Sequence, residues 1–228
     1  MELETVRLIA TDTESNKLVT KLHEDNIFCR GKSLMMNIIL VSSLEGSELI
    51  DDFLLMDEQP TINIIICLNR ELEINTNKHY QSILYLSEEK DSFQALKDFL
   101  SAIRYNIEIH GLVGFDFRDF KQIISGKNLL SIQIAEFSKN LSEGFCLLKT
   151  ASHIPYKRFL ISLYFKDHND FTKNQADQLN DFMESYQTGD DTFICWNLHE
   201  NQKQQIMIMA TKPLYGSSLS GQGVTVEQ

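Results

Sequence analysis

Short, uninterrupted apolar runs separated by polar segments mark the first 90 residues. The runs span residues 6–10, 37–41, 62–68 and 83–86. Runs of this length predict strands, and continuous apolar character is typical of a parallel sheet covered on both faces. Residues 47–56 predict a helix between the second and third strands. Few residues remain for other helices, so we expect an abbreviated form of a doubly wound unit.

A single apolar stripe at helical spacing follows these strands. It consists of Phe93, Leu96, Leu100, Ile103 and Ile107. Positions three and four residues apart lie on one face of a helix, so this segment predicts a long helix that buries one side. Asp91 or Ser92 suits its start, and Gly111 stands just past its end.

The second half mixes strands with helices. We expect strands at residues 129–134, 159–165, 192–197 and 205–210, and helices at residues 116–125 and 171–186. A short polar loop joins the last two strands, which predicts an antiparallel hairpin. The Gly- and Ser-rich residues 215–228 predict a mobile tail.

Acidic side chains outnumber basic ones, and this limits the possible partners. The chain has 228 residues with 32 Asp plus Glu against 21 Lys plus Arg, a net charge of −11. An acidic surface repels phosphate backbones, and no basic patch larger than a pair is present, so we expect no nucleic-acid partner. With 43% apolar and 23% charged residues, the composition excludes disorder over most of the length.

Nothing in the sequence predicts a membrane protein or a secreted one. The longest uncharged apolar stretch, residues 33–44, falls well short of the about 20 residues that a bilayer span needs. The amino terminus lacks a signal-peptide pattern. Cys29, Cys67, Cys146 and Cys195 form no C-x-x-C pair, which favours reduced, buried thiols in a cytoplasmic protein.

Two familiar kinds of site are weak on inspection. Gly31-Lys32-Ser33 looks like the end of a phosphate-binding loop, but Asn26 stands where the first glycine belongs, and the tripeptide precedes a strand instead of following one. The six histidines occur singly, without the spacing of a metal-binding pair. We therefore expect no metal site, and a turn accounts for Gly31.

Residues 111–121, GLVGFDFRDFK, carry more information. Asp116 and Asp119 stand three apart at the start of a predicted helix. The ordinary explanation is that Asp116 caps the helix and Asp119 complements its dipole, and spacing alone favours that interpretation.

The same segment resembles the FtsZ/tubulin superfamily. In FtsZ the long central helix ends in a loop of the form G-L-I-N-x-D-F-A-D-V, whose acids help to position the attacking water in the next subunit of the filament. The match lies at Gly111, Leu112, Val113, Asp116, Phe117 and Asp119. Gly114 replaces the family's asparagine and has no side chain to hold a water, so the two acids are expected to be a relic.

The resemblance continues downstream for roughly 100 residues. Residues 159–165, 170–187, 190–194 and 205–211 follow the strand, helix, acidic turn and last strand of the FtsZ activation domain. It implies an α/β chain with four parts: an abbreviated nucleotide-binding-like domain at 1–90, a central helix at 91–110, an α+β activation domain with a mixed four-stranded sheet at 111–213, and a tail at 214–228.

Upstream, the elements that grip GTP depart from the family. Residues 6–18 resemble the strand that leads into an N-T-D turn, so the family's first strand and its glycine loop are expected to be missing. The helix between the first two strands of this chain is expected to be missing as well. The tubulin signature G-G-G-T-G-T-G is replaced by residues 42–48, SSLEGSE. Of the degenerate phosphate loop formed by Ser43, Glu45, Gly46 and Ser47, only Gly46 is a glycine, and Glu45 and Glu48 would repel a triphosphate.

Three hypotheses follow. The first is a non-catalytic, cytoplasmic, FtsZ-like scaffold or filament modulator of prokaryotic origin. It needs no cofactor, and its interface contains Gly114, Asp116, Arg118 and Asp119, with an FtsZ-type filament or a second copy as partner. The second is a GTP-binding switch or weak GTPase whose phosphate contacts come from Arg30, Gly31, Lys32 and Ser33. The third is an α/β protein that shares only the topology.

Overall fold

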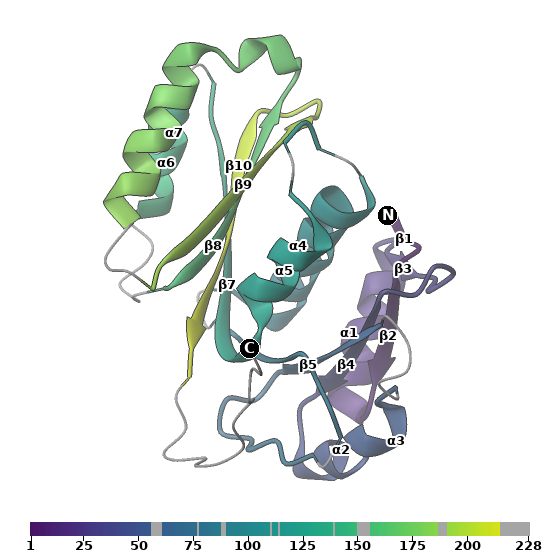
Figure 1. The fold of residues 1–228 in the computed structure, drawn as a ribbon. Coiled ribbons are helices and arrows are strands. Elements are labelled where there is room, and N and C mark those ends of the chain that lie inside the picture. Colours follow the sequence, from purple (N-terminus) through teal and green to yellow (C-terminus); the bar gives the residue numbers. More distant parts are fainter. Residues whose placement is uncertain are drawn as a thin grey trace, which may run out of the picture.

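The elements of the chain follow each other as strands and helices in a layered α/β arrangement, shown in Figure 1. This computed structural model describes residues 1–55, 61–76, 78–87, 90–109, 111–113, 115–138, 140–149, 156–186 and 191–214. The tail predicted at residues 215–228 and the interface position Gly114 lie outside the described residues.

One eight-stranded sheet runs through the described part of the chain in the order β2-β4-β5-β6-β7-β10-β8-β9. Its strands are β2 (Val6–Ala10), β4 (Met36–Val41), β5 (Ile62–Cys67), β6 (Ser82–Leu86), β7 (Gly126–Glu136), β8 (Arg158–Phe165), β9 (Phe193–Glu200) and β10 (Gln205–Pro213). A second, two-stranded parallel sheet pairs β1 (Glu2–Leu3) with β3 (Phe28–Cys29).

The parallel sheet predicted for the first half is confirmed. Strands β2, β4, β5 and β6 pair in parallel, and β6 continues in parallel onto the start of β7. Every residue of β4 is buried. Its apolar side chains alternate between two core clusters on opposite faces of the sheet, which is why this strand is a continuous apolar run in the sequence.

The second half contains the predicted mixed four-stranded sheet, but the predicted terminal hairpin is wrong. Strand β10 lies between β7 and β8 and is antiparallel to both, whereas β9 pairs in parallel with β8 at the edge. The more apolar β10 takes the central position, and the more polar β9 takes the edge. A loop of four residues can cross the width of one intervening strand, so its shortness did not require pairing.

A helix that the sequence analysis expected to be missing is present between β2 and β4. Helix α1 (Thr13–Glu24) begins with a capping box in which Asp12 accepts from the amide of Ser15 and the Ser15 hydroxyl accepts from the amide of Asp12. Its inward face is narrow, with Ser15 and Leu22 buried. The helical signal was therefore in the cap, whereas the resemblance of residues 6–18 to a strand followed by an N-T-D turn did not indicate a helix.

The helix predicted at residues 47–56 starts earlier and is broken. Helix α2 (Leu44–Glu48) is capped by Ser43, whose hydroxyl accepts from the amide of Gly46. Helix α3 (Ile50–Phe53) follows directly and ends before the extended Leu54. The Ser43 cap sets the start of this segment.

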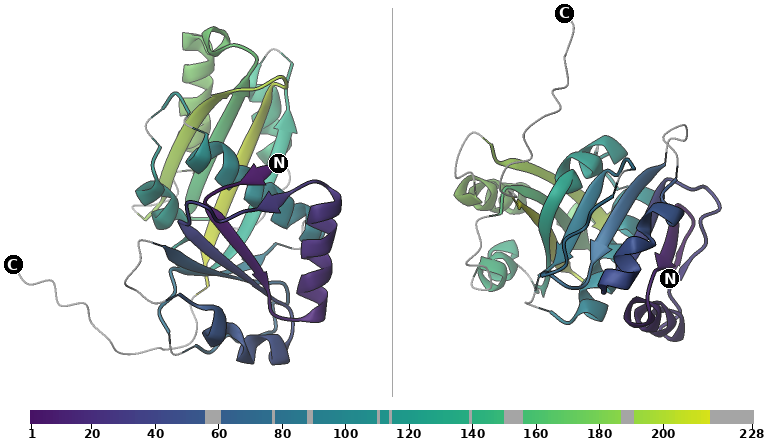
Figure 2. Two further views of the ribbon diagram at one scale, coloured as in Figure 1. Left: turned by 90° about the vertical axis from the view of Figure 1, so that its right-hand side faces the viewer. Right: turned by 90° about the horizontal axis from the view of Figure 1, so that it is seen from below.

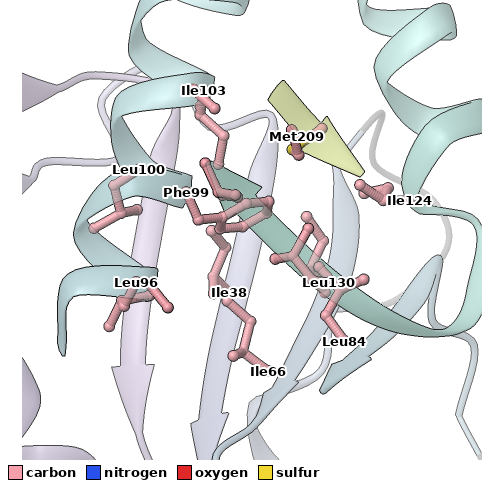
Figure 3. Packing of buried hydrophobic residues seen from close by; sticks show 14 of the residues in the cluster. Ile38, Ile66, Leu84, Leu96, Phe99, Leu100, Ile103, Ile124, Leu130 and Met209 are labelled. Atoms are coloured by element: carbon pink, nitrogen blue, oxygen red, sulfur yellow. The ribbon is translucent and has the colours of Figure 1, made fainter. Parts of the chain in front are cut away.

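The central helix is confirmed, with a change of pitch near its end. Helix α4 (Ser92–Ile103) is capped by the Asp91 carboxylate and continues as a π-helix, η1 (Arg104–Glu108). Its stripe packs on the sheet, as Figure 3 shows for Leu96, Phe99, Leu100 and Ile103 against residues from several strands. The widened turn of η1 is a feature found often at functional sites.

Helices cover both faces of the C-terminal strands (Figure 2). Helices α4 and α5 (Phe117–Ile124) contact one face, and α6 (Leu141–Lys149) and α7 (Lys173–Tyr186) lie against the other. Helix α6 and the short 3₁₀ turn η2 (His168–Asp170) were not predicted from the sequence. Among the described residues, no helix has the length and apolar character needed to cross a bilayer.

Candidate functional site

The carboxyl ends of β2 and β4 meet at one edge of the parallel sheet, where α/β proteins place their ligands. Residue Asp12 follows β2 and caps α1, and Ser42 and Ser43 follow β4 and lead into α2. Two loops that are 30 residues apart in the sequence are therefore in contact. We take this edge, which contains the predicted degenerate phosphate loop, as the candidate site.

The Asp12 carboxylate collects the hydrogen-bond donors of this edge. The backbone amides of Ser42 and Ser43 donate to Asp12 Oδ2 at 2.7 and 3.1 Å, and the Ser42 hydroxyl donates to Oδ1 at 2.6 Å. The Ser43 hydroxyl and the amide of Ser15 donate as well, at 3.4 and 2.9 Å. Burial by itself raises the pKa of this carboxyl, but the hydrogen bonds from Ser42 and Ser15 outweigh it and lower the pKa to about 2.

Gly46 is the one glycine of residues 42–48, and it allows a close approach of the backbone to Asp12. A Cβ atom at this position would lie 2.4 Å from Asp12 Oδ2 and 2.7 Å from Thr11 Oγ1. No side chain fits there without displacing the carboxylate. The structure thus explains Gly46 through an internal contact.

The other predicted loop residues surround this contact without joining it. The hydroxyl of Ser47 donates a hydrogen bond to the carbonyl of Leu44 at 2.6 Å, so this donor is already engaged within α2. Glu45 and Glu48 are exposed beside it. The edge therefore offers carboxylates on its surface and a carboxylate in its interior, and the amides of Ser42 and Ser43 already have an acceptor.

Asp116 and Asp119 form a reciprocal cap at the start of α5. Asp116 Oδ1 accepts from the amides of Arg118 and Asp119 at 2.7 and 3.0 Å, while Asp119 Oδ2 accepts from the amide of Asp116 at 3.1 Å. The backbone hydrogen bonds from Asp119 and Arg118 lower the pKa of the exposed Asp116 carboxyl. The capping explanation is confirmed, and the predicted interface residue Arg118 is exposed beside the cap.

A cleft of about 420 Å³ lies next to this cap. Its lining includes Met35, Ile107, Leu112, Phe115 and Asp116. Met35 immediately precedes β4, so the cleft lies at the amino edge of the parallel sheet, opposite the edge that holds Asp12. Within one chain, the two acids of α5 therefore cannot act on the Ser43 loop.

Buried polar groups fix the segment that leads to the cleft. The Asn106 side chain of η1 exchanges hydrogen bonds with Ser162 of β8, and its Oδ1 also faces Asn197 Nδ2 and His199 Nε2 of β9, at 3.3 and 3.2 Å. Gly111 packs against Asn197, where a Cβ would lie 2.1 Å from Oδ1. The other ring nitrogen of His199 is buried with no hydrogen-bond partner among the described residues, and burial lowers the pKa of His199 to about 4.

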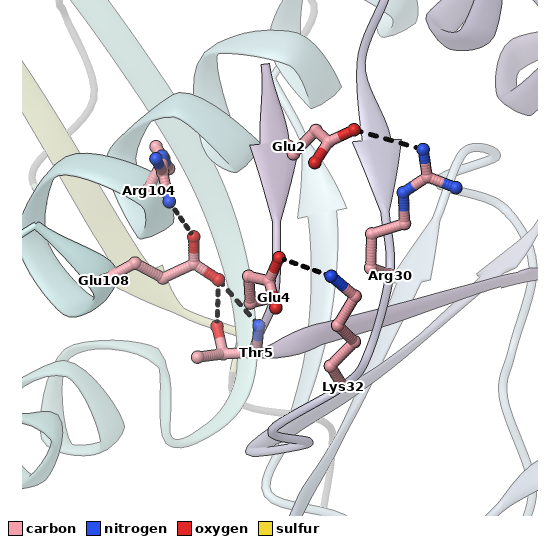
Figure 4. Close-up of polar contacts among 7 residues, drawn as sticks. All are labelled: Glu2, Glu4, Thr5, Arg30, Lys32, Arg104 and Glu108. Atoms are coloured by element: carbon pink, nitrogen blue, oxygen red, sulfur yellow. Dashed lines mark hydrogen bonds and ion pairs between the residues drawn. The ribbon is translucent and has the colours of Figure 1, made fainter.

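The alternative phosphate-binding segment, residues 30–33, lies at the amino end of β4, and its two cations already form ion pairs. Arg30 and Lys32 form ion pairs with Glu2 and Glu4, each at 3.1 Å, as Figure 4 shows. Gly31 has φ +60°, which explains the glycine by a turn. Because Lys32 and Ser33 come just before β4, they lie at its amino end, away from the Ser43 loop.

One group of exposed side chains was missed by the sequence analysis. The ligand atoms of Asp167, His168 and Glu200 lie within 4.8 Å of one another. His168 Nδ1 lies 2.6 Å from Glu200 Oε1, and this hydrogen bond raises the pKa of the exposed His168. Residues 168 and 200 are brought together by the pairing of β8 with β9, so their spacing in the sequence could not predict this group.

Solved structures with the same fold include filament-forming proteins. Neither a protein-family model nor a curated protein matches the sequence. TubZ of Bacillus thuringiensis, in a GTPγS-form protofilament, has a TM-score of 0.52 at 12% identity over 86% of this chain and 66% of TubZ. CetZ2 of Haloferax volcanii, a GTPγS-bound protofilament, has a TM-score of 0.52 at 8% identity over 86% of this chain and 70% of CetZ2.

CetZ of Methanosaeta thermophila gives a TM-score of 0.53 at 11% identity, over 87% of this chain and 65% of its own. This chain thus spans about two thirds of the length of the proteins it resembles. Identities this low establish a common fold only. This chain therefore has the fold of TubZ and CetZ.

Proposed function

We propose that this chain is a non-catalytic interaction subunit of the tubulin/FtsZ fold, which acts on a filament of that fold or associates with itself without using GTP. The observation that carries the proposal is the position of Asp12. Its carboxylate accepts the Ser42 and Ser43 amides at the sheet edge where an α/β protein would hold phosphate.

The electrostatics of this edge support a subunit without nucleotide. A phosphate oxygen would have to displace Asp12 from five donors and then lie near Glu45 and Glu48. Two like charges about 4 Å apart repel by roughly 4 kcal/mol at an effective dielectric of 20. The carboxyl is held ionised because its pKa is lowered to about 2, so the repulsion persists at neutral pH.

The opposite edge supports an interaction role. The cleft beside Leu112 and Phe115 lies next to the capped start of α5, with Arg118 and Leu112 exposed. TubZ and CetZ2 both occur as protofilaments. We therefore propose that this end docks on the end of a filament subunit, and that the edge around Asp12 prevents regular addition of the next subunit. A cytoplasmic location is part of the same proposal.

Calorimetry with GTP and Mg²⁺ tests the absence of nucleotide binding. We expect no heat of binding from the folded protein, and micromolar binding would overturn the proposal. The interaction role is tested by sedimentation with FtsZ-type filaments. Arg118→Glu should weaken co-sedimentation, whereas Lys173→Glu, a charge reversal at an exposed position of α7, should leave it unchanged. Equal effects of both variants would count against docking through α5.

A further inference from the structure

The segment that follows the Ser43 loop presents an unusual outer face. Helices α2 and α3 are nearly continuous, because Leu49 between them keeps the right-handed helical conformation. The inward positions Gly46, Ile50 and Leu54 recur every four residues and are buried. The outward positions are Leu44, Glu45, Glu48, Leu49 and Asp52. Their spacing places them on one helical face, which we call the leucine–acid stripe.

The two leucines of this stripe take no part in the core. The exposed fraction is 67% for Leu44 and 43% for Leu49. A helix on the surface normally carries polar side chains on its outer face, and here the inner face is already filled by Ile50 and Leu54. Exposed apolar side chains that share one face and are rimmed by polar residues mark candidate protein interaction sites.

The charges of the stripe have a single sign. Glu45, Glu48 and Asp52 have no cationic partner among the described residues, whereas the neighbouring Asp51 is engaged by Thr76 and Lys78. Residues 44–55 contain no Lys or Arg. An occupant of this face must therefore bring cations together with apolar side chains.

We propose that the leucine–acid stripe docks a basic amphipathic helical segment of a partner protein. The proposal rests on the proposed interaction role and names the partner chemistry at the end of the molecule opposite the α5 cleft. A convex helical face suits a second helix, whose apolar ridge packs between Leu44 and Leu49 while its Lys and Arg side chains meet the acids. A second copy is a poor occupant, because the chain carries a net charge of −11 and its own stripe is acidic.

Binding of a synthetic peptide to the full chain tests this assignment. The probe is a helical peptide of about 18 residues with leucine on one face and lysine on the other, long enough to form helix on docking. Its control has serine in place of each leucine. We expect the leucine peptide to bind in a salt-dependent manner, and the serine peptide to bind at least about tenfold more weakly because it lacks the apolar contact.

Variants locate the binding face. The double substitution Leu44→Ser with Leu49→Ser should weaken binding about tenfold or more, and Glu45→Gln with Glu48→Gln should reduce both affinity and salt dependence. Leu147→Ser is the matched control, because Leu147 is 62% exposed on α6, away from the stripe. Unfolding midpoints in urea confirm that each variant is folded.

The other possible results show whether a basic helix, a second copy of this chain or neither occupies the leucine–acid stripe. No binding of the leucine peptide, or an equal loss with Leu147→Ser, overturns the proposal. Sedimentation that shows a dimer of the wild type and a monomer of the Leu44/Leu49 variant would assign the face to a second copy and also overturn it. Calorimetry with GTP on the same samples keeps the two proposals separate. Nucleotide binding would overturn the proposed function, whereas the docking of a basic helix is judged by the peptide result.

Discussion

The backbone amide of Ser42 donates a hydrogen bond of 2.7 Å to the carboxylate of Asp12, across two loops that are far apart in the sequence. This bond ties the end of β4 to the start of α1 at the carboxyl edge of the parallel sheet. It places an internal anion among the amides that follow β4. The carboxyl edge of the parallel sheet thus has donors that are satisfied from within the chain.

Replacing Asp12 should destabilise the protein. Asp12→Ala removes the cap of α1 and leaves the Ser42 amide without its carboxylate acceptor, so we expect a loss of about 1–3 kcal/mol in the free energy of unfolding. Urea denaturation measures this loss. Glu14→Ala is the control, because the Glu14–Lys17 pair is exposed and should change stability by less than about 1 kcal/mol. Equal stability of Asp12→Ala and the wild type would contradict our account of this edge.

Gly46→Ala should be costly for a reason that depends on Asp12. The new Cβ would lie 2.4 Å from Asp12 Oδ2, and overpacking of this kind costs about 1–3 kcal/mol. A double-mutant cycle in urea tests the cause. In an Asp12→Ala background the alanine at position 46 should cost less, because the nearest atom that it meets, Asp12 Oδ2, is gone while the contact with Thr11 Oγ1 remains. Strict additivity of the two changes would show that Gly46 is required for another reason.

Protonation of His199 should weaken the fold in mild acid. Burial lowers its pKa to about 4 from the ordinary 6.5, so the unfolded chain binds the proton more readily between these values. Stability is then complete above pH 6.5 and falls as the pH drops toward 4, by up to about 3 kcal/mol in all. His199→Gln, which cannot titrate, should flatten this part of the profile of unfolding free energy against pH.

The comparison with His168 sharpens that test. The pKa of His168 is raised by Glu200, so its contribution has the opposite sign: it is present below the ordinary pKa and is lost as the pH rises. His168→Gln should therefore leave the acid-side slope in place. If both variants retained the slope of the wild type, His199 would not be its source.

Glu108 should matter far more than the ion pairs beside it. Its carboxylate accepts from the amide and hydroxyl of Thr5, both at 2.7 Å, and from Arg104 at 2.7 Å (Figure 4). The Glu108 side chain is only 5% exposed, so Glu108→Ala leaves the part-buried donors of Thr5 and Arg104 without their acceptor and should cost about 1–3 kcal/mol. Glu4→Ala breaks the exposed pair with Lys32 and should cost less than about 1 kcal/mol in the same denaturation experiment.

The elements with strong local signals could be predicted from the sequence. The runs at residues 37–41 and 62–68 gave buried parallel strands because both faces of that sheet are covered. The stripe that includes Phe93 and Leu100 gave the central helix. Asp116 and Asp119 gave a cap, since a cap needs only residues three apart.

Elements that depend on partners far along the chain could not be predicted in this way. Helix α1 has little apolar surface, and its start depends on a capping box that resembled a turn. The neighbours of β10 depend on which strands compete for the centre of the sheet, and the loop before it fits either arrangement. The division of the chain into separate domains stays a prediction, because the pairing of β6 with β7 makes one continuous sheet.

For the candidate site, the sequence by itself determined which groups are present: the single glycine of residues 42–48, the acids Glu45 and Glu48, and the capping pair in α5. Only the tertiary structure decided that the Asp12 carboxylate accepts the amides of Ser42 and Ser43, and that Asp116 lies at the opposite edge of the sheet. The reason is physical. A cap or an apolar stripe is fixed by neighbours in sequence, whereas the acceptor of a loop amide is fixed by the pairing of β2 with β4, which no local pattern records.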